Sequence, residues 1–159
     1  MADERFLGTG MKFPPEIDPA TGRFQTVSGA KAVKESIYII LMTKKTERIV
    51  RPEFGSNVMD YTFMDTGETM LSILRRDITE TILAQEPRVS NVDVTTDVRE
   101  KQGYILVNVD YTISATNSRD NLVFPFYLNA EETEIDEEEP EYYDPDMPSE
   151  SGYYMEDGT

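Results

Sequence analysis

The sequence contains no cysteine and no histidine among its 159 residues. Without cysteine there is no disulfide and no thiolate metal site. Without histidine the commonest general base is missing, together with the Ser-His and Cys-His nucleophile pairs and the usual zinc and copper ligands. These absences leave few routes to catalysis, and we expect neither a metal nor a cofactor.

Long hydrophobic runs are also missing. The longest apolar stretch, residues 37–42, is far too short to span a bilayer. The first five residues, Met1 to Arg5, lack the basic start and apolar run of a secretory signal. We therefore expect a soluble protein that is made in the cytoplasm and has no membrane partner, with room in its length for one domain.

Positive charge is absent from the C-terminal part of the chain. The net charge is −16, but residues 129–159 hold 13 acidic residues and no basic one. Residues 1–128 carry all 15 Lys and Arg against 18 Asp and Glu, so this part is nearly neutral. Neither part shows the basic stripe that binding to phosphates requires, which argues against a nucleic-acid partner.

Residues 129–159 form an acidic tail that contains three prolines and little aliphatic content. Such a composition is typical of a segment that is disordered by itself. Its tyrosines add apolar area to a segment that otherwise repels itself, and we expect them to anchor the tail. They occur as two pairs, Tyr142 with Tyr143 and Tyr153 with Tyr154.

The rest of the chain divides into an extended N-terminal arm over 1–22, rich in Gly and Pro, and a folded domain over 23–128. Apolar spacing predicts a helix over 29–43, with Ser28 as N-cap, after a short strand over 23–27. Residues 44–67 are expected to be a connector, with residues 47–50 extended.

A second helix is predicted to begin near Asp65, which forms a capping box pattern with Glu68, although Gly67 weakens that pattern. Pro87 disfavours helical geometry at the residue before it, so the helix should end at Glu86. The apolar stripe of this helix consists of Leu71, Leu74, Ile78 and Ile82.

Alternating apolar residues then predict strands. Residues 92–98 and 105–113 form a hairpin within 91–115, and residues 122–128 form a final strand. Pro125 cannot donate a ladder hydrogen bond, so the final strand should lie at an edge. The predicted fold class is α+β, with two main helices packed on a small, mostly antiparallel sheet made of a C-terminal hairpin plus the edge strand.

The sequence Glu86-Pro87-Arg88 stands where the second helix stops and the strands begin. Structurally, Pro87 ends the helix and Arg88 is a surface cation. Functionally, a guanidinium just beyond a helix C-terminus can satisfy free carbonyls or pair bidentately with a carboxylate on another chain. The rigid proline sets the direction of both charges, which suits a docking corner.

Several short motifs occur together with this corner in a fixed order along the chain. They are Gly10 with Phe13-Pro14, Gly22, Ile40-Leu41-Met42-Thr43, Glu47-Arg48, Pro52-Glu53-Phe54-Gly55, Glu86-Pro87-Arg88 and Phe124-Pro125. This order resembles the baseplate wedge and sheath-initiator family of contractile injection systems, which serves contractile-tailed phages, tailocins and type VI secretion. The resemblance covers roughly residues 8–128. The family commonly has a Gly before its Glu-Arg pair, where this chain has Thr46.

The resemblance implies a structural virion or injection-system subunit with no chemistry of its own. It implies docking of Glu86, Pro87 and Arg88 on the helical core bundle of the wedge. It also implies a sheet that the tail sheath extends by strand addition, without saying at which edge. Pro125 marks an unpaired edge, and edges accept strands, so Phe124, Pro125 and Phe126 are expected to be partner-binding residues. Further implied partners are tube-proximal baseplate proteins, with roughly six copies of the chain around the tail axis and synthesis in the host cytoplasm.

Three alternatives stay open. Arg48, Arg51, Pro52, Phe54 and Gly55 form either a structured turn, which we favour, or a direct partner contact. A bacterial anti-adaptor shares a similar fold, so a regulatory binding protein is the main alternative function. A muralytic enzyme is the other, because some family members have carried a lysozyme label. In such an enzyme Glu53, which stands beside Phe54, would be the best available candidate for the catalytic acid.

Overall fold

A computed structural model describes residues 4–128 of the chain. The elements in chain order are η1 (Glu4–Leu7), β1 (Thr9–Met11), β2 (Thr26–Ser28), α1 (Gly29–Met42), η2 (Val58–Phe63), α2 (Glu68–Gln85), β3 (Val89–Arg99), η3 (Glu100–Gln102), β4 (Tyr104–Ile113) and β5 (Ser118–Tyr127). The predicted tail, with its four tyrosines, lies outside the described residues.

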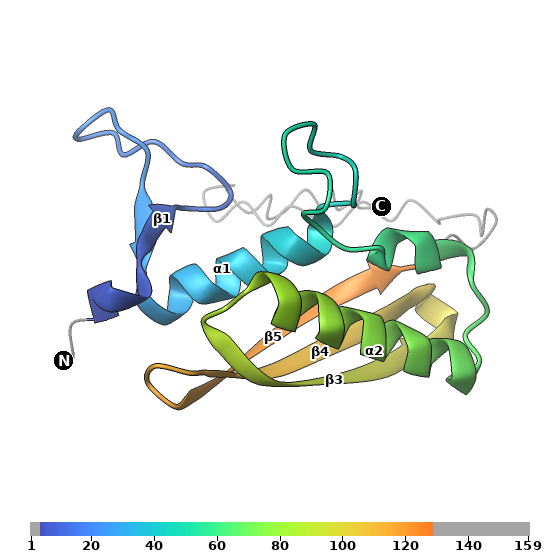
Figure 1. Ribbon diagram of the computed structural model, residues 1–159. Coiled ribbons are helices and arrows are strands. Elements are labelled where there is room, and N and C mark those ends of the chain that lie inside the picture. The colour runs from blue at the N-terminus through green and yellow to red at the C-terminus, as the bar shows by residue number, and fades with distance from the viewer. Residues whose placement is uncertain (1–3, 129–159) are drawn as a thin grey trace, which may run out of the picture.

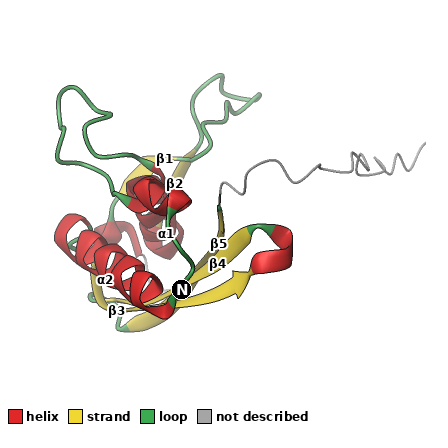
Figure 2. Cartoon of the chain, turned by 90° about the vertical axis from the view of Figure 1, so that its right-hand side faces the viewer, coloured by secondary structure: helices red, strands yellow, loops and turns green. Residues whose placement is uncertain are grey.

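The domain has two layers. The antiparallel sheet β3-β4-β5 forms one layer, and α1 and α2 cover one of its faces (Figure 1). Seen from the side, α2 lies over β3 and α1 lies toward β5 (Figure 2). This arrangement confirms the predicted α+β class and the predicted hairpin with an added edge strand.

Helix α1 matches its prediction over Gly29–Met42, with Val33, Ile37 and Leu41 fully buried against the sheet. Ser28 stands at the N-cap position, but its hydroxyl makes no capping hydrogen bond, so that part of the prediction is wrong. Instead, β2 leads directly into the helix and positions its first turn.

Helix α2 begins at Glu68, and Gly67 is its N-cap. The predicted capping box from Asp65 is therefore wrong, because Asp65 precedes the helix and no side chain caps it. The apolar stripe is buried as predicted, and the helix ends at Gln85, one residue before the proline-restricted Glu86. No helix in residues 4–128 is long and apolar enough to cross a membrane.

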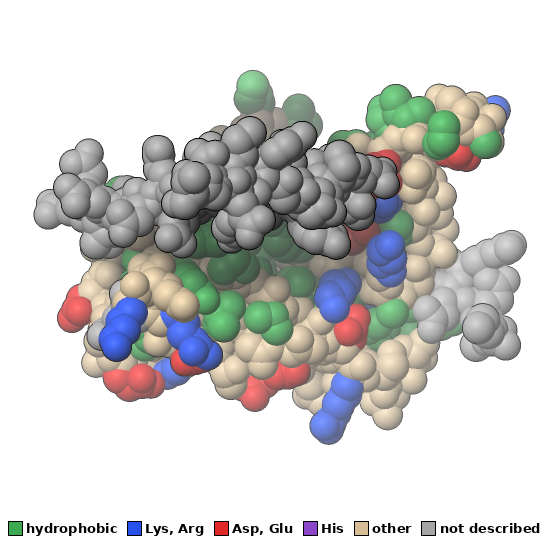
Figure 3. Space-filling view, turned by 180° about the vertical axis from the view of Figure 1, so that it is seen from behind, with side chains coloured by type: hydrophobic (Ala, Val, Ile, Leu, Met, Phe, Trp, Pro, Cys, Tyr) green, Lys and Arg blue, Asp and Glu red, His purple; other side chains and the backbone are tan. Residues whose placement is uncertain are grey.

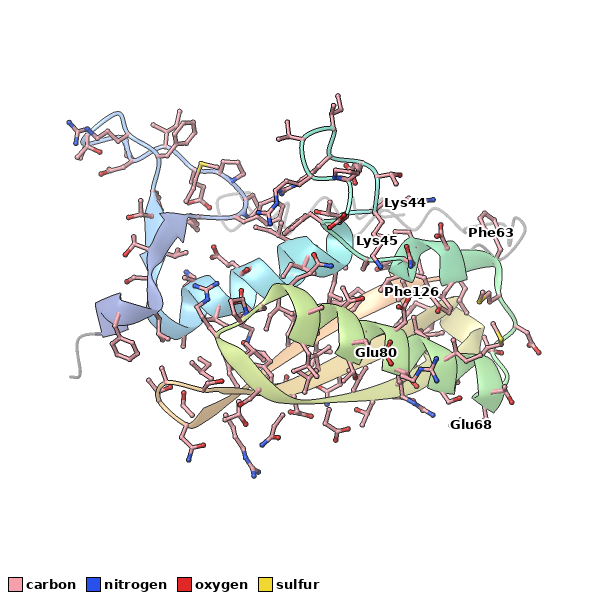
Figure 4. All side chains as sticks on the ribbon, in the orientation of Figure 1. Lys44, Lys45, Phe63, Glu68, Glu80 and Phe126 are labelled. Atoms are coloured by element: carbon pink, nitrogen blue, oxygen red, sulfur yellow. The ribbon has the colours of Figure 1, made fainter. Side chains whose placement is uncertain are left out.

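The alternation of β4 and β5 determines which side chains form the core. Every second residue from Ile105 to Ile113 is buried, and so are Leu122, Phe124 and Phe126 on β5. Phe126 extends from the sheet toward the helices (Figure 4). These aromatic and branched side chains interdigitate with the stripes of α1 and α2, so one cluster holds both layers together.

The N-terminal segment is less extended than predicted. Residues 9–11 pair with residues 26–28 in a two-stranded antiparallel sheet, and an isolated bridge joins Ile17 to Phe24. The strand expected over 23–27 is therefore displaced toward Ser28. Leu7 is buried in the core cluster, because the short helix η1 packs on α1.

The connector between α1 and α2 is a folded loop rather than an extended segment. Residues 47–50 form no strand, contrary to expectation, and η2 was not foreseen. A parallel bridge between Lys44 and Ser56 closes the loop at its base. The Ser56 hydroxyl donates to the Leu41 carbonyl at 2.7 Å, which ties the loop to the end of α1.

Gly55 is the residue on which this closure depends. Its φ is +110°, and a Cβ added there would lie 2.3 Å from the Thr43 carbonyl oxygen. The Gln85 side chain also bonds both backbone groups of Gly55, accepting from N–H at 2.9 Å and donating to C=O at 2.7 Å. Only glycine satisfies both the backbone angle and the close approach.

Gly55→Ala should therefore lower the free energy of unfolding by more than about 2 kcal/mol, because strain and a backbone clash add. Gly22→Ala is the matched control, since Gly22 has φ +66° but nothing within 4 Å of an added Cβ. It should cost only the strain of about 1–2 kcal/mol. Urea denaturation of both variants checks this, and equal losses would show that the closure at Thr43 is unimportant.

Candidate interaction site

Glu86 and Arg88 form a bidentate ion pair across Pro87. Arg88 Nε donates to Glu86 Oε1 at 2.6 Å, and a terminal guanidinium nitrogen donates to Oε2 at 2.7 Å. Glu86 is only 2% exposed, whereas the Arg88 side chain is 30% exposed. Pro87 makes this geometry possible because it ends the helix and turns the chain, so that residues two apart face each other.

The same guanidinium holds the N-terminal segment. Its other terminal nitrogen donates to the Leu7 carbonyl at 2.8 Å. Gly8, with φ +90°, then turns the chain from η1 into β1 beside that nitrogen. Arg88 thus joins three pieces of chain: the end of α2, the start of β3 and the segment that leads into β1.

The electrostatics follow from burial and pairing. Burial of Glu86 raises its pKa, but hydrogen bonds from Arg88 and Ser36 and the Arg88 charge outweigh this, so the pKa lies below its usual 4.5. The bonds to Glu86 likewise raise the pKa of Arg88 against its partial burial. Both groups are therefore ionised at neutral pH.

This geometry corrects one expectation. Arg88 is not a surface cation free for another chain, because its bidentate partner is Glu86 of its own chain. Glu86 is not a contact residue either, since it is buried. A partner that docks at this corner can reach Arg88 and Pro87, while Glu86 acts from beneath as the group that orients Arg88.

Beside the corner lies a cavity of about 360 Å³. Residues from both predicted motifs meet there, since Arg48 and Phe54 come from the connector and Arg88 from the corner. The Arg48 guanidinium carbon lies 4.1 Å above the centre of the Phe54 ring, a cation–π contact. The remaining lining residues are Gly8, Thr9, Gly10, Met11, Val27, Ala32, Glu35, Ser36 and Ile39.

The turn residues divide between two cavities. Arg51 and Pro52 line a different hollow of about 680 Å³ on the α2 side of the connector, together with Phe54 and Glu53. Gly55 lines neither and closes the loop instead. The structured-turn interpretation is therefore correct for Gly55, and a partner contact remains a prediction for the exposed Arg48 and Arg51.

The residues predicted at the sheet edge also divide. Phe124 and Phe126 are buried, so their side chains belong to the core and do not face a partner, contrary to expectation. Pro125 between them is exposed, and β5 pairs only with β4 among the described strands. The edge position of β5 was predicted correctly.

Sequence reasoning missed Leu7 and Ser36. Leu7 contributes a carbonyl oxygen, which no side-chain pattern indicates. Ser36 reaches Glu86 only through tertiary packing. Tyr38, in contrast, falls off the apolar stripe of α1 and so predicts a second contact surface on that helix, and its ring contacts Phe13 with 5.9 Å between centroids.

Arg88→Ala should destabilise the chain by about 3–5 kcal/mol at neutral pH, because it leaves a buried carboxylate without its cation. A double replacement by Met at Glu86 and Arg88 should recover much of this loss, since apolar pairs of similar volume avoid desolvation. Urea denaturation measures both. A loss below about 1 kcal/mol for Arg88→Ala is what a surface pair would give and contradicts this account.

The pair also predicts a pH dependence. Because the folded pKa of Glu86 is depressed, its contribution to stability is complete above the usual 4.5 and is lost as pH falls through the folded value. The wild type should therefore lose stability as pH falls below about 4.5, in part through this group. In the double Met variant, the free energy of unfolding should fall less steeply with decreasing pH, because this carboxyl group is absent.

Comparisons with known proteins agree with this fold. A family model described as "Baseplate wedge protein gp25" matches residues 27–118. A crystal structure from Geobacter sulfurreducens, described as a candidate tail lysozyme, is 36% identical with a TM-score of 0.61. It matches over 68% of this chain and 99% of its own. No curated protein matches.

Two baseplate structures are also similar. A chain of the anti-feeding prophage baseplate is 26% identical over 81% of this chain and 92% of its own, with a TM-score of 0.54. A chain of the type VI secretion baseplate complex is 18% identical, with a TM-score of 0.53. The match covers 62% of this chain and 93% of the other, and it supports the fold alone. With more than half of its length matched by the family model, the chain belongs to the baseplate wedge protein gp25 family, whose members are baseplate components.

Proposed function

We propose that the chain is a structural wedge subunit that docks on the core bundle of the wedge and nucleates the sheath by strand addition. The observation that carries the docking half is the convergence of Gly10, Arg48, Phe54 and Arg88 on one cavity. These residues come from three separate segments of the chain, and none of them belongs to the hydrophobic core cluster that holds the fold.

The cavity has the chemistry of a docking site for an acidic and apolar segment. Arg88 is held by Glu86 and Leu7 in one orientation, and its fork still has N–H donors for an acceptor on a partner. Arg48 supplies a second cation, and Met11, Ile39 and Phe54 supply apolar walls. Preorganised guanidinium groups lose little freedom on binding, which favours affinity.

The domain limits are part of the proposal. The predicted domain over 23–128 docks together with part of the predicted arm over 1–22, because Gly8 to Met11 line the cavity and Leu7 belongs to the core cluster. We take residues 129–159 as an acidic tail outside the shared core. Tube-proximal baseplate proteins are further partners, with roughly six copies around the tail axis. Synthesis takes place in the host cytoplasm, before assembly into a phage tail or injection-system baseplate.

Arg48→Glu should weaken binding to the purified wedge core proteins of the same machine by roughly a hundredfold, because it reverses a charge at the cavity. Arg48 is exposed, and its side chain contacts the Phe54 ring among the described residues, so the thermal midpoint should change little. Calorimetry or a quantitative pull-down measures the binding.

Lys101→Glu is the matched control, the same charge reversal on the exposed turn between β3 and β4. It should bind the wedge proteins like the wild type. Wild-type binding by Arg48→Glu, or an equal loss in both variants, would contradict docking at this cavity.

We also propose that the subunit has no muralytic activity. A glycosidase needs two carboxylates flanking its cleft, one with a raised pKa. Glu53 is the single carboxylate among the residues that line the larger hollow. Among residues 4–128, the two carboxyl groups with shifted pKa values are Asp18 and Glu86. Hydrogen bonds from Ala20 and Thr21 lower the pKa of Asp18, and hydrogen bonds from Arg88 and Ser36 lower that of Glu86.

The purified full-length protein should therefore not clear peptidoglycan in a turbidity assay with hen lysozyme as positive control. Glu53→Gln should behave identically. Clearance by the wild type that disappears in Glu53→Gln would make the protein an enzyme.

A further inference from the structure

Within the part of the chain that the structure describes, β3 and β5 are the two edges of the sheet. The hydrogen-bond register determines which backbone groups each edge offers to a partner. Leu128 N–H donates to the Gly103 carbonyl, and the β4–β5 register continues from there without a shift. In an antiparallel ladder, successive residues point their backbone groups alternately toward and away from the partner strand. Even-numbered residues of β5 therefore face β4, and odd-numbered residues face outward.

Pro125 is one of these outward positions. Its missing N–H costs no bond to β4, which explains how a proline fits within a ten-residue strand. Val123 and Tyr127 on either side keep outward N–H groups, and Val123, Pro125 and Tyr127 all keep outward carbonyls. The N–H of Asn121 is already bonded to the Asp120 carboxylate at 2.7 Å. A strand added here meets donors at two positions and none at Pro125, which restricts its register.

A groove of about 350 Å³ lies beside this edge. Its walls come from three elements: Leu122 of β5, Tyr38 of α1, and Phe13 and Pro14 of the loop between β1 and β2. The Phe13 N–H donates to the Glu35 carboxylate at 3.0 Å, which holds the loop against α1. Lys34 lies at the rim, 3.7 Å from Asp120. Hydrophobic side chains gather near the middle of the face seen from behind (Figure 3).

Leu122 belongs both to the edge strand β5 and to the wall of the groove. Its backbone N–H and C=O point toward β4. If an antiparallel strand is added on the other side of β5, the residue opposite Leu122 therefore forms a non-hydrogen-bonded pair with it. Such pairs bring Cα atoms within about 4.5 Å and their side chains into contact. Directly opposite residues place their side chains on the same face of the sheet. The partner residue opposite Leu122 would therefore place its side chain in the groove between Tyr38 and Phe13.

The β3 edge lacks these features. It has a register shift between Ser90 and Asp93, with Asn91 at φ +49°, and its solvent face carries Asp93 and Asp97. Bulges and charges of this kind protect edges from pairing. On β5, in contrast, the solvent face of the sheet carries apolar side chains, Val123 and Tyr127, which are 53% and 66% exposed.

We infer that β5 is the edge that receives the sheath strand, and that the groove formed by Phe13, Tyr38 and Leu122 takes one large apolar side chain of that strand. This inference rests on the proposed function, in which the sheath adds a strand to the sheet. It adds which edge receives the strand and which groove selects its sequence. Backbone bonds at Val123 and Tyr127 supply affinity, and the groove selects the register and the sequence.

Two backbone variants of the full-length protein test the edge, with the purified sheath protein of the same machine as probe. Val123→Pro removes an outward donor and no bond to β4, so the fold should persist while sheath nucleation stops. Val123→Thr keeps the donor and the shape and should nucleate normally. Thr96→Pro removes an outward donor of β3 and should also nucleate normally, provided that circular dichroism shows a folded chain.

The outcomes separate the two levels of the proposal. Loss in Thr96→Pro with normal nucleation in Val123→Pro would move the strand to β3, which overturns this inference and leaves strand addition intact. Normal nucleation in both proline variants would overturn strand addition itself.

The groove is tested by Phe13→Ser, which removes one wall and should weaken sheath binding by roughly tenfold or more. Phe24→Ser removes an exposed aromatic from the same loop that does not line the groove, and should bind like the wild type. Equal binding by both variants would show that the groove is not used.

Amide hydrogen exchange of the free full-length protein tests the occupant. The Val123 and Tyr127 amides should exchange rapidly alone and become protected with sheath protein. Protection in the free protein, by residues 129–159 or by a second copy of the chain, would mean that the edge has another occupant and would overturn the inference.

Discussion

The buried Glu86–Arg88 pair is the interaction on which the arrangement of this molecule depends. A carboxylate that is 2% exposed is stable only with a cation and hydrogen bonds, and Arg88 and Ser36 provide both. Since Arg88 also binds the Leu7 carbonyl, the requirement of one buried charge fixes where η1, α1, α2 and β3 meet. Without this pair, the N-terminal segment would lose the hydrogen bond that ties Leu7 to the end of α2 and the start of β3.

Most of the fold could be predicted because each element carries its own periodicity. The stripe of α2, the alternation of β4 and the proline in β5 are local patterns, and they correspond to the observed core and edge. The errors are at element ends and in the two segments without periodicity, the N-terminal segment and the connector. The capping box at Asp65 and the cap at Ser28 failed because caps depend on the path by which the chain enters the helix, which tertiary contacts determine.

The site was predicted in its residues but not in its contacts. Glu86 and Arg88 were identified as charges set in direction by Pro87, yet their mutual pairing and the Leu7 carbonyl required knowledge of burial. Thr46 shows the reverse case. It stands where the resembled family commonly has Gly, and its φ of +73° is the left-handed conformation that glycine adopts freely. The turn keeps its geometry, and the threonine accepts the strain.

The two proposed contacts differ in the physics that each would use. Docking at the cavity would depend on side chains, because guanidinium groups held in fixed directions bind the partner, and it would be sensitive to charge. Strand addition at β5 would depend on backbone hydrogen bonds, so the partner's sequence could vary except at the residue that enters the groove. Both surfaces belong to one unit, because the core cluster joins α1, α2 and the sheet without a hinge between them. A subunit oriented on the wedge by its side chains would therefore hold its free strand edge in a defined direction, which is the requirement for starting an ordered sheath ring.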